Sequence, residues 1–326
     1  MAGVPGLTET KTAVVVGSAG QDGYYLTRLL SGKGYDIIGL SRSGLSNSRG
    51  RRERPVDIED GQAVAALIRD VRPAEVYYLA AHHRSSEDDV EDIYGCFLRS
   101  LAVHVCGLLN FLGAIDRDSH QTRLFYAASS HIFGDPQTVP QTEMTPLAPT
   151  DPYGITKACG LQMCRAYRRD RGLFSSVGIM YNHESPRRSP AFVTRKIVQA
   201  VVAIKRGERD RLVLGDLGAA IDWGVAADYV EAMHRILSLD EADDFVVASG
   251  ETHTVGEFAE TAFRALGLDS GRYLIEDSSL ISKAARRRPL VGDASKLRRR
   301  TGWTPSQSFE DMVRDMVTVE LAADPT

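Results

Sequence analysis

Short apolar segments alternate with amphipathic stretches along the first half of the chain. Apolar runs at 12–16, 36–40, 75–80 and 123–128 have the length of buried β-strands and are bounded by glycines or charged residues. Helical periodicity follows the glycines after residue 16 and recurs at 61–70 and 91–116. This alternation predicts an α/β fold with a doubly wound parallel sheet.

The alternation becomes irregular after residue 180. A polar, proline-containing segment at 182–190 precedes a predicted helix at 192–206 and a predicted strand at 211–214. A helix at 226–238 and a strand at 244–248 then have the pattern of a return to the sheet. We predict one domain over residues 1–180, with return segments near 225–250. A smaller C-terminal substrate-binding lobe over 181–326 is interleaved with it.

A glycine-rich loop follows the first predicted strand and opens the first helix, with the pattern G-x-x-G-x-x-G from Gly17 to Gly23. Glycine at such positions lets a pyrophosphate approach the backbone, and the helix N-terminus offers unpaired N–H groups. The loop therefore predicts that residues 1–180 form a dinucleotide-binding Rossmann domain. We place Gly17, Gly20, Gln21, Asp22 and Gly23 at the cofactor.

The segment after the second predicted strand is basic and lacks an acid at the strand end. Arg42 lies two residues past the strand, and arginines follow at 49, 51, 52 and 54. An acidic residue there binds the ribose 2′-hydroxyl of NAD, whereas a cation suits the 2′-phosphate of NADP. The sequence favours NADP, with NAD as the alternative. Asp57 and Ile58, after a third strand-like segment, are expected at the adenine.

Tyr153 and Lys157 have the spacing Y-x-x-x-K, which puts them on one face of a helix. The lysine ammonium is expected to lower the pKa of the tyrosine, so that Tyr153 takes a proton from a sugar hydroxyl while hydride passes to nicotinamide. Ser129, at the end of the preceding strand, is able to hydrogen-bond the same hydroxyl. The pattern predicts oxidation of a secondary alcohol.

In these features and in others the chain resembles the GDP-mannose 4,6-dehydratases, which are extended short-chain dehydrogenases/reductases. The resemblance covers nearly the whole chain. Its most specific segment is the run Asn-His-Glu-Ser-Pro-Arg-Arg at 182–188, which points to guanosine diphosphate rather than another nucleotide. The other matching segments are Gly20-Gln-Asp-Gly23, Phe192-Val-Thr-Arg-Lys196, Asp222-Trp-Gly224, Asp228-Tyr-Val-Glu-Ala-Met233, Ser249-Gly-Glu-Thr-His253, Gly292-Asp293 and Gly302-Trp-Thr-Pro305.

The resemblance implies that the smaller lobe binds a nucleotide sugar. It implies contacts to the GDP moiety from Asn182, Arg187, Val193, Lys196 and Arg288. Lysine and arginine side chains are suited to such contacts, since they are natural partners of a diphosphate.

The chain departs from this family where the family has its C5 base. The family sequence Thr-Ser-Glu is Ser129-Ser130-His131 here, so a histidine replaces the glutamate that removes the C5 proton. A neutral imidazole also accepts a proton near neutral pH. We therefore place Ser130 at the substrate and count His131 among the catalytic residues.

A second departure lies near the sugar and the nicotinamide. The family segment Asn-Leu-Ala-Ala-Gln-Ser-His is Tyr-Leu-Ala-Ala-His-His-Arg at 78–84. The unchanged part of this segment places Leu79 and Ala81 at the cofactor. The changed positions favour a substrate other than plain GDP-mannose, or a different second half-reaction.

Three outcomes remain open after oxidation at C4, and a protein without catalytic activity is a further alternative. Dehydration would use His131 to remove the C5 proton and would return the hydride to C6. A 4-epimerase would return the hydride to C4 and would need no C5 base. A 4-keto reductase would consume the cofactor, and a non-catalytic dinucleotide sensor would have no need of Ser129, Tyr153 and Lys157 together.

Composition argues against several classes of partner and bound group. The 326 residues carry a net charge of −4, which argues against nucleic acid as a partner, and no apolar run has the length of a membrane span. The four cysteines have neither disulfide-framework nor metal-ligand spacing. We expect a cytoplasmic protein that binds no metal. The resemblance implies a homodimer or homotetramer that pairs through helices including 91–116 and 153–170.

Overall fold

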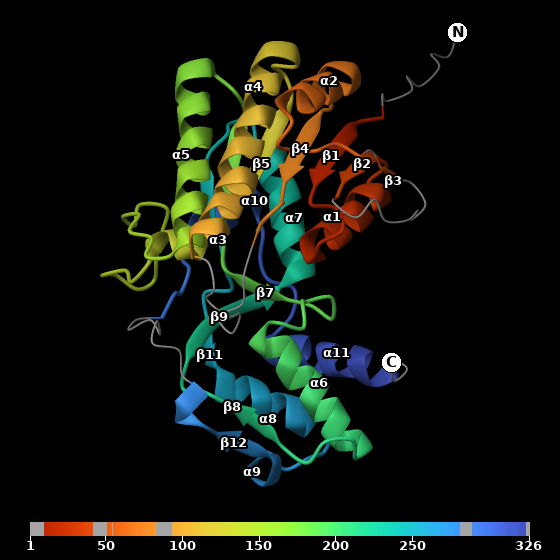
Figure 1. The fold of residues 1–326 in the computed structure, drawn as a ribbon, viewed down its shortest axis with the longest axis vertical. Coiled ribbons are helices and arrows are strands. Elements are labelled where there is room, and N and C mark those ends of the chain that lie inside the picture. The colour runs from red at the N-terminus through yellow and green to blue at the C-terminus, as the bar shows by residue number, and fades with distance from the viewer. Residues whose placement is uncertain (1–9, 42–50, 54, 83–92, 281–288, 324–326) are drawn as a thin grey trace.

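The computed structural model describes residues 10–41, 51–53, 55–82, 93–280 and 289–323. Its main sheet has seven parallel strands in the order β10-β6-β5-β4-β1-β2-β3 (Figure 1), which confirms the predicted doubly wound α/β fold. The strands are β1 (Thr12–Val16), β2 (Asp36–Leu40), β3 (Arg51–Glu53), β4 (Glu75–Tyr78), β5 (Arg123–Ser129), β6 (Ser175–Met180) and β10 (Asp244–Val247).

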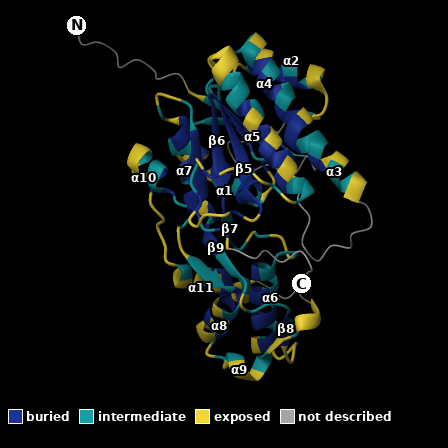
Figure 2. Ribbon diagram, turned by 90° about the vertical axis from the view of Figure 1, so that its left-hand side faces the viewer, coloured by how far each residue is buried: buried dark blue, intermediate teal, exposed yellow. Residues whose placement is uncertain are grey.

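Helices cover both faces of this sheet. One face packs against α2 (Gly61–Val71), α4 (Leu108–Asp118) and α5 (Pro152–Arg171), and the other against α1 (Gln21–Gly32), α7 (Ala226–Leu237) and α10 (Ser295–Thr301). Strand β1 shows why its sequence is apolar throughout, because Val14 and Val16 enter the first core whereas Ala13 and Val15 enter the second. Figure 2 shows the sheet buried between these two helical layers.

The helix predicted at 91–116 is present with an irregular centre. It consists of α3 (Ile93–Leu101), a π-helical turn at Ala102–Gly107 and α4. By length and composition alone the stretch Ile93–Asp118 is apolar enough to cross a membrane, but half of its most apolar window is buried inside the protein. Packing of α4 against α2 and α5 accounts for that apolar character.

A second apolar core lies below the main sheet in Figure 1. It is built by α6 (Val193–Arg206), α8 (Val255–Ala265), α11 (Phe309–Ala322) and the parallel pair β8 (Leu212–Leu214) and β12 (Leu274–Glu276), with α9 (Ser270–Tyr273) at the bottom of the view. A three-stranded sheet of β11 (Thr252–Thr254), β9 (Ala220–Val225) and β7 (Asn182–Glu184) lies between this core and the main sheet.

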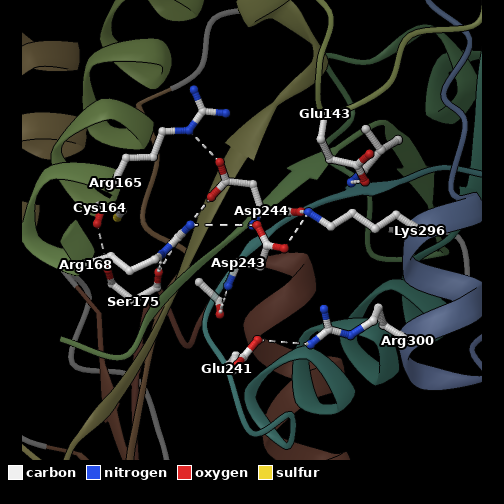
Figure 3. Close-up of polar contacts among 12 residues, drawn as sticks. Glu143, Cys164, Arg165, Arg168, Ser175, Glu241, Asp243, Asp244, Lys296 and Arg300 are labelled. Atoms are coloured by element: carbon white, nitrogen blue, oxygen red, sulfur yellow. Dashed lines mark hydrogen bonds and ion pairs between the residues drawn. The ribbon is translucent and has the colours of Figure 1, made fainter. Parts of the chain in front are cut away.

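The edge strand β10 is held by charged side chains from two helices (Figure 3). The buried carboxylate of Asp244 lies 2.5 Å from Arg165 Nε and 2.7 Å from Arg168 Nη2, both on α5. From α10, Lys296 Nζ lies 2.6 Å from Asp243 Oδ2. Because α5 and α10 belong to opposite faces of the sheet, these ion pairs hold β10 from both sides.

The glycine loop between β1 and α1 is closed so tightly that a side chain does not fit at Gly23. A Cβ atom there would lie 2.3 Å from Gly17 O and 2.6 Å from Ser18 Cα. Both obstacles are backbone atoms, so neither is able to rotate away. The first turn of α1 therefore depends on glycine at this position.

We expect Gly23→Ala to lower the free energy of unfolding by about 1–3 kcal/mol, because the loop must open to admit the methyl group. Dinucleotide affinity should fall by at least ~10-fold, about 1.4 kcal/mol. Urea denaturation and calorimetric titration measure the two effects. The matched control is Gly32→Ala at the end of the same helix, where an added Cβ meets nothing within 4 Å. Equal stability of the two variants would contradict the steric argument.

Candidate active site

The glycine loop lies against the segment that follows β4, where Leu79 is one of the predicted cofactor residues. Gly17 has φ +92°, and a Cβ there would lie 2.9 Å from Ala80 N and 3.1 Å from the carbonyl carbon of Leu79. The Gly17 N–H also donates to Leu40 O at the end of β2, at 2.9 Å. The carboxyl ends of β1, β2 and β4 thus converge on one bare backbone turn, where a side chain would fill the space needed for close approach.

The side chains of Gln21 and Asp22 face the second lobe. Gln21 Nε2 donates to His183 O at 3.0 Å, and Ser185 Oγ donates to Gln21 Oε1 at 2.7 Å. Asp22 Oδ1 lies 2.9 Å from His183 Nε2. The cofactor contacts predicted for these two residues would therefore have to come from their backbone N–H groups, in a first helical turn that no side chain caps.

His183 is protonated on both nitrogens. Its Nδ1 lies 2.7 Å from Tyr181 O, an atom that only accepts, so Nδ1 donates there and Nε2 donates to the Asp22 carboxylate. Burial alone would lower the pKa of His183, but the Asp22 carboxylate outweighs burial and raises it. Burial would likewise raise the pKa of Asp22, which His183 nevertheless lowers. A buried ion pair joins α1 to β7.

Ser129, Tyr153 and Lys157 lie together as predicted from the sequence. Tyr153 on α5 hydrogen-bonds the side chain of Ser129 at the end of β5. Lys157 Nζ is buried 5.7 Å from the centre of the Tyr153 ring and donates to Ala127 O at 2.7 Å. A substrate hydroxyl beside Tyr153 would meet both the phenol and the serine.

Burial dominates the pKa values of both Tyr153 and Lys157 in this structure. Burial raises the pKa of Tyr153 to about 12 and lowers that of Lys157 to about 7. After burial, the strongest influence on the Tyr153 phenol is the positive charge of Arg188, which lowers its pKa. Desolvation prevails because Lys157 is buried and Tyr153 is partly buried.

His131 lies beside these residues. Its ring meets the Tyr153 ring edge to face with centroids 5.4 Å apart, and its backbone N–H donates to Ser129 Oγ at 3.3 Å. Its Nδ1 lies 3.0 Å from Asp151 Oδ2. The neighbouring predicted substrate residue, Ser130, is buried in the same short turn. The sequence therefore positions an imidazole next to the phenol.

The comparisons with known proteins agree with this arrangement. The family model for GDP-mannose 4,6 dehydratase matches residues 14–316. The protein named GDP-mannose 4,6 dehydratase 2 from Arabidopsis thaliana is 39% identical over 333 residues, covering 95% of this chain and 87% of its own. This chain belongs to the GDP-mannose 4,6-dehydratase family.

Solved structures share the fold of this family member. RMD from Pseudomonas aeruginosa, complexed with NADPH, superposes with a TM-score of 0.80 at 21% identity, covering 96% of this chain and 99% of its own. The dTDP-glucose 4,6-dehydratase from Bacillus anthracis, in complex with NAD, gives a TM-score of 0.79 at 20% identity, covering 95% and 96%.

The predicted substrate residues of this family member stand on β7 and α6. Asn182 begins β7, Val193 begins α6, and Lys196 follows within one turn, where burial lowers its pKa. Arg187 stacks on Tyr24 of α1, with its guanidinium carbon 4.0 Å from the ring centre.

The predicted residues Arg42 and Arg288 lie outside the described residues. Ile58 O accepts a hydrogen bond from Asn110 Nδ2 at 2.9 Å, and Asp57 Oδ1 accepts one from the Glu59 N–H at 2.9 Å.

Arg188 and His104 went unassigned in the sequence, as did Asp151. Arg188 closes the run 182–188 and packs on Phe192, with its guanidinium carbon 3.6 Å from the ring centre, so its signal was present in the motif. His104 is buried in the π-helical turn, and its ring meets Tyr153 edge to face with centroids 5.2 Å apart. A histidine on an apolar helix carries no signal of such a role.

Within the described ranges no three His, Cys, Asp or Glu side chains group as metal ligands.

We expect the stability contributed by the Asp22–His183 pair to fall as the pH rises. The folded-state pKa of His183 is raised above 6.5, so its contribution is complete below that value and is lost as the pH passes the raised pKa. The contribution of Asp22 is present above 3.8 and is lost only on acidification. Asp22→Asn should therefore cost about 1.5–3 kcal/mol near pH ~6 and distinctly less near pH ~9.

Urea denaturation of wild type and variant at the two pH values measures this difference. Asp70→Asn serves as control, because its exposed carboxylate lies 3.8 Å from Arg69 and should change stability little at either pH. A cost for Asp22→Asn that does not vary with pH would contradict an imidazolium at His183.

Proposed function

We propose that this protein oxidises C4 of a GDP-linked sugar and then removes water across C5 and C6, giving a 4-keto-6-deoxy sugar. The observation that carries the proposal is the position of His131 beside both Ser129 and Tyr153. An imidazole there is next to the groups that handle the C4 hydroxyl, and C5 is the adjacent carbon. The names of the sequence relatives support the same reaction.

The bare backbone at Gly17 and the uncapped first turn of α1 fit a dinucleotide pyrophosphate. When bound, the nicotinamide supplies a hydride acceptor for C4, a hydride donor for C6 and, in its oxidised form, a positive charge that lowers the pKa of a nearby phenol. Gly17, Gly20 and Gly23 would hold the pyrophosphate, and Leu79 and Ala81 would lie toward the nicotinamide.

In the first step the C4 alcohol loses a proton from its oxygen and a hydride from its carbon. Tyr153 accepts the hydroxyl proton, and Ser129 holds the same oxygen by a hydrogen bond. The positive charge of Arg188 opposes the effect of burial on the Tyr153 pKa and so stabilises the tyrosinate form. Lys157 fixes the end of β5 through its bond to Ala127 O.

The second step needs a base at C5. The C4 ketone acidifies the C5 proton, His131 removes it, and the C6 hydroxyl leaves as water. The alternative is a 4-epimerase, which the replacement of the family glutamate by His131 keeps open because that reaction leaves C5 untouched. The two reactions differ in whether mass is lost and whether the C5 hydrogen exchanges with solvent.

We propose that the nucleotide is GDP. Asn182, Arg187, Val193, Lys196 and Arg288 are the contact residues that the family resemblance implies. Lys196 begins α6 beside the run 182–188, and a cation in that position suits a diphosphate.

We propose that the protein self-associates through α3 and α5. Large apolar side chains are exposed on both helices, namely Ile93, Tyr94 and Leu98 on α3 and Ile155 on α5. The two helices pack together, so these side chains belong to one side of the molecule. A second copy of the chain is the partner that the resemblance implies.

NADP should bind more tightly than NAD by at least ~10-fold, because Arg42 and the arginines after it suit the 2′-phosphate. Calorimetric titration of protein stripped of nucleotide measures both affinities. Arg42→Ala should weaken NADP binding and leave NAD binding nearly unchanged. Tighter binding of NAD by the unaltered protein would overturn the preference.

Tested on a panel of GDP-sugars, the proposed reaction predicts a product lighter than its substrate by one water and, in deuterated water, solvent deuterium at C5. Mass spectrometry and proton NMR measure both, with a UDP-linked hexose as the control substrate. His131→Ala should lose ~10²–10⁴-fold in dehydration and still reduce bound cofactor when substrate is added. Tyr153→Phe should lose both activities.

Each alternative outcome has a distinct meaning. A product of unchanged mass without deuterium at C5 would replace dehydration with 4-epimerisation. Dehydration by His131→Ala at more than about a tenth of the normal rate, a loss of only ~1.4 kcal/mol, would remove His131 from the role of base.

A further inference from the structure

Asp151 holds two groups with one carboxylate. It is the N-cap of α5, and its Oδ1 accepts the backbone N–H of Gly154 at 2.7 Å. Its Oδ2 lies 3.0 Å from His131 Nδ1. The side chains of Asp151 and His131 are 39% and 26% exposed, so the pair is partly desolvated and still partly accessible. The start of the helix that carries Tyr153 and the orientation of His131 are thus set by the same side chain.

This contact determines which nitrogen of His131 is basic. An ionised carboxylate only accepts hydrogen bonds, so Nδ1 of His131 must carry the proton that it donates to Asp151. In a neutral imidazole the lone pair that takes up a further proton then belongs to Nε2. The carboxylate also stabilises the imidazolium that forms when Nε2 takes up a proton, because a positive charge then lies next to a negative one.

We propose that Asp151 is the positioning residue that makes His131 competent as the base for the C5 proton; this rests on the proposed dehydration. Nε2 takes the C5 proton, and the C5–H electron pair becomes the enolate of the C4 ketone. The imidazolium then returns this proton to the C6 hydroxyl, and the C6–O bond breaks to release water. The hydride taken from C4 adds to C6, and the proton that Tyr153 took from the C4 hydroxyl goes to C5.

The pair also accounts for the charge at this position. A glutamate base carries one negative charge and places it on the basic atom. A neutral histidine next to an ionised aspartate carries the same total charge, with the basic atom displaced to Nε2. The His131–Asp151 pair therefore has the same total charge as a single glutamate base.

Asp151 and other charged groups also affect the pKa of Tyr153. Asp151 and Asp22 raise the pKa of Tyr153, whereas Arg188 lowers it. Loss of the Asp151 charge therefore lowers the pKa of Tyr153 and increases the fraction present as tyrosinate, so it is not expected to impair oxidation at C4. An effect confined to the C5 step separates positioning of His131 from a general disturbance of α5.

The test replaces Asp151 with asparagine, which remains a good N-cap but has no charge. Asp151→Ser is the second variant, because serine also caps a helix but is too short to reach His131. Asp269→Asn is the matched control, an N-cap exchange at α9 in the other lobe, where Asp269 Oδ1 accepts the Gly271 N–H at 3.0 Å. Circular dichroism and thermal melting check that each variant is folded.

Three measurements are expected to change together in Asp151→Asn and Asp151→Ser. Histidine ¹⁵N NMR of the free enzyme should show loss of the Nδ1–H tautomer and a lower pKa for His131, by about one unit. The acid limb of the kcat profile should move to lower pH by the same amount, since the base must be unprotonated. The kcat for dehydration should fall by ~10²-fold or more, while KM and the rate of cofactor reduction stay within about threefold.

Each result decides one question. An unchanged His131 tautomer, or equal losses of cofactor reduction and dehydration, would overturn the role of Asp151 and leave the proposed dehydration standing. If the wild-type protein releases no water from any GDP-sugar, the proposed function fails, whereas the NMR titration still decides whether Asp151 controls His131. Loss of dehydration in Asp269→Asn would also count against the proposal.

Discussion

The ion pair between Asp22 and His183 is the contact on which the rest of the site depends. It joins the first turn of α1, next to the glycine loop, to β7, which begins the run 182–188. His183 also stacks on Tyr229 of α7 with ring centroids 4.5 Å apart. Separating the pair would leave a buried charge without a partner, which is strongly unfavourable. The strand that leads to Arg187 and Arg188 is therefore held in a defined position relative to the cofactor loop.

Burial controls the charges inside the site more than pairwise contacts do. It moves the pKa of Tyr153 upward and that of Lys157 downward, and each shift favours the neutral form. A proton-transfer group held neutral is ready to exchange a proton as soon as a charge arrives next to it. Arg188 lowers the pKa of Tyr153, and under the proposed function a positive charge on a bound ligand would act in the same direction and couple proton abstraction to occupancy of the site.

The sequence predicted those parts of the fold and site that depend on local pattern. Strands β1 and β2 were placed within their observed bounds, because apolar runs between glycines and charges have few other conformations. The bounds of strand β3, Arg51–Glu53, were not predicted, because three charged residues at a sheet edge carry no apolar signal. Ser129 and Tyr153 were found from a strand end and a helical spacing. Asp151 was missed because its bond to His131 spans 20 positions and exists only once α5 packs on β5.

The π-helical turn in the long helix supports the same site from its other side. There His104 Nε2 accepts the backbone N–H of His82 at 3.0 Å, and its Nδ1 lies 2.8 Å from Thr156 Oγ1. An acceptor at Nε2 places the ring proton on Nδ1, so His104 donates to Thr156 of α5. A π-helical turn shifts a buried side chain out of the regular α-helical register. Here it places the His104 imidazole between β4 and α5. The segment after β4 and the helix that carries Tyr153 are therefore linked through one neutral ring, whose position a regular α-helix would not provide.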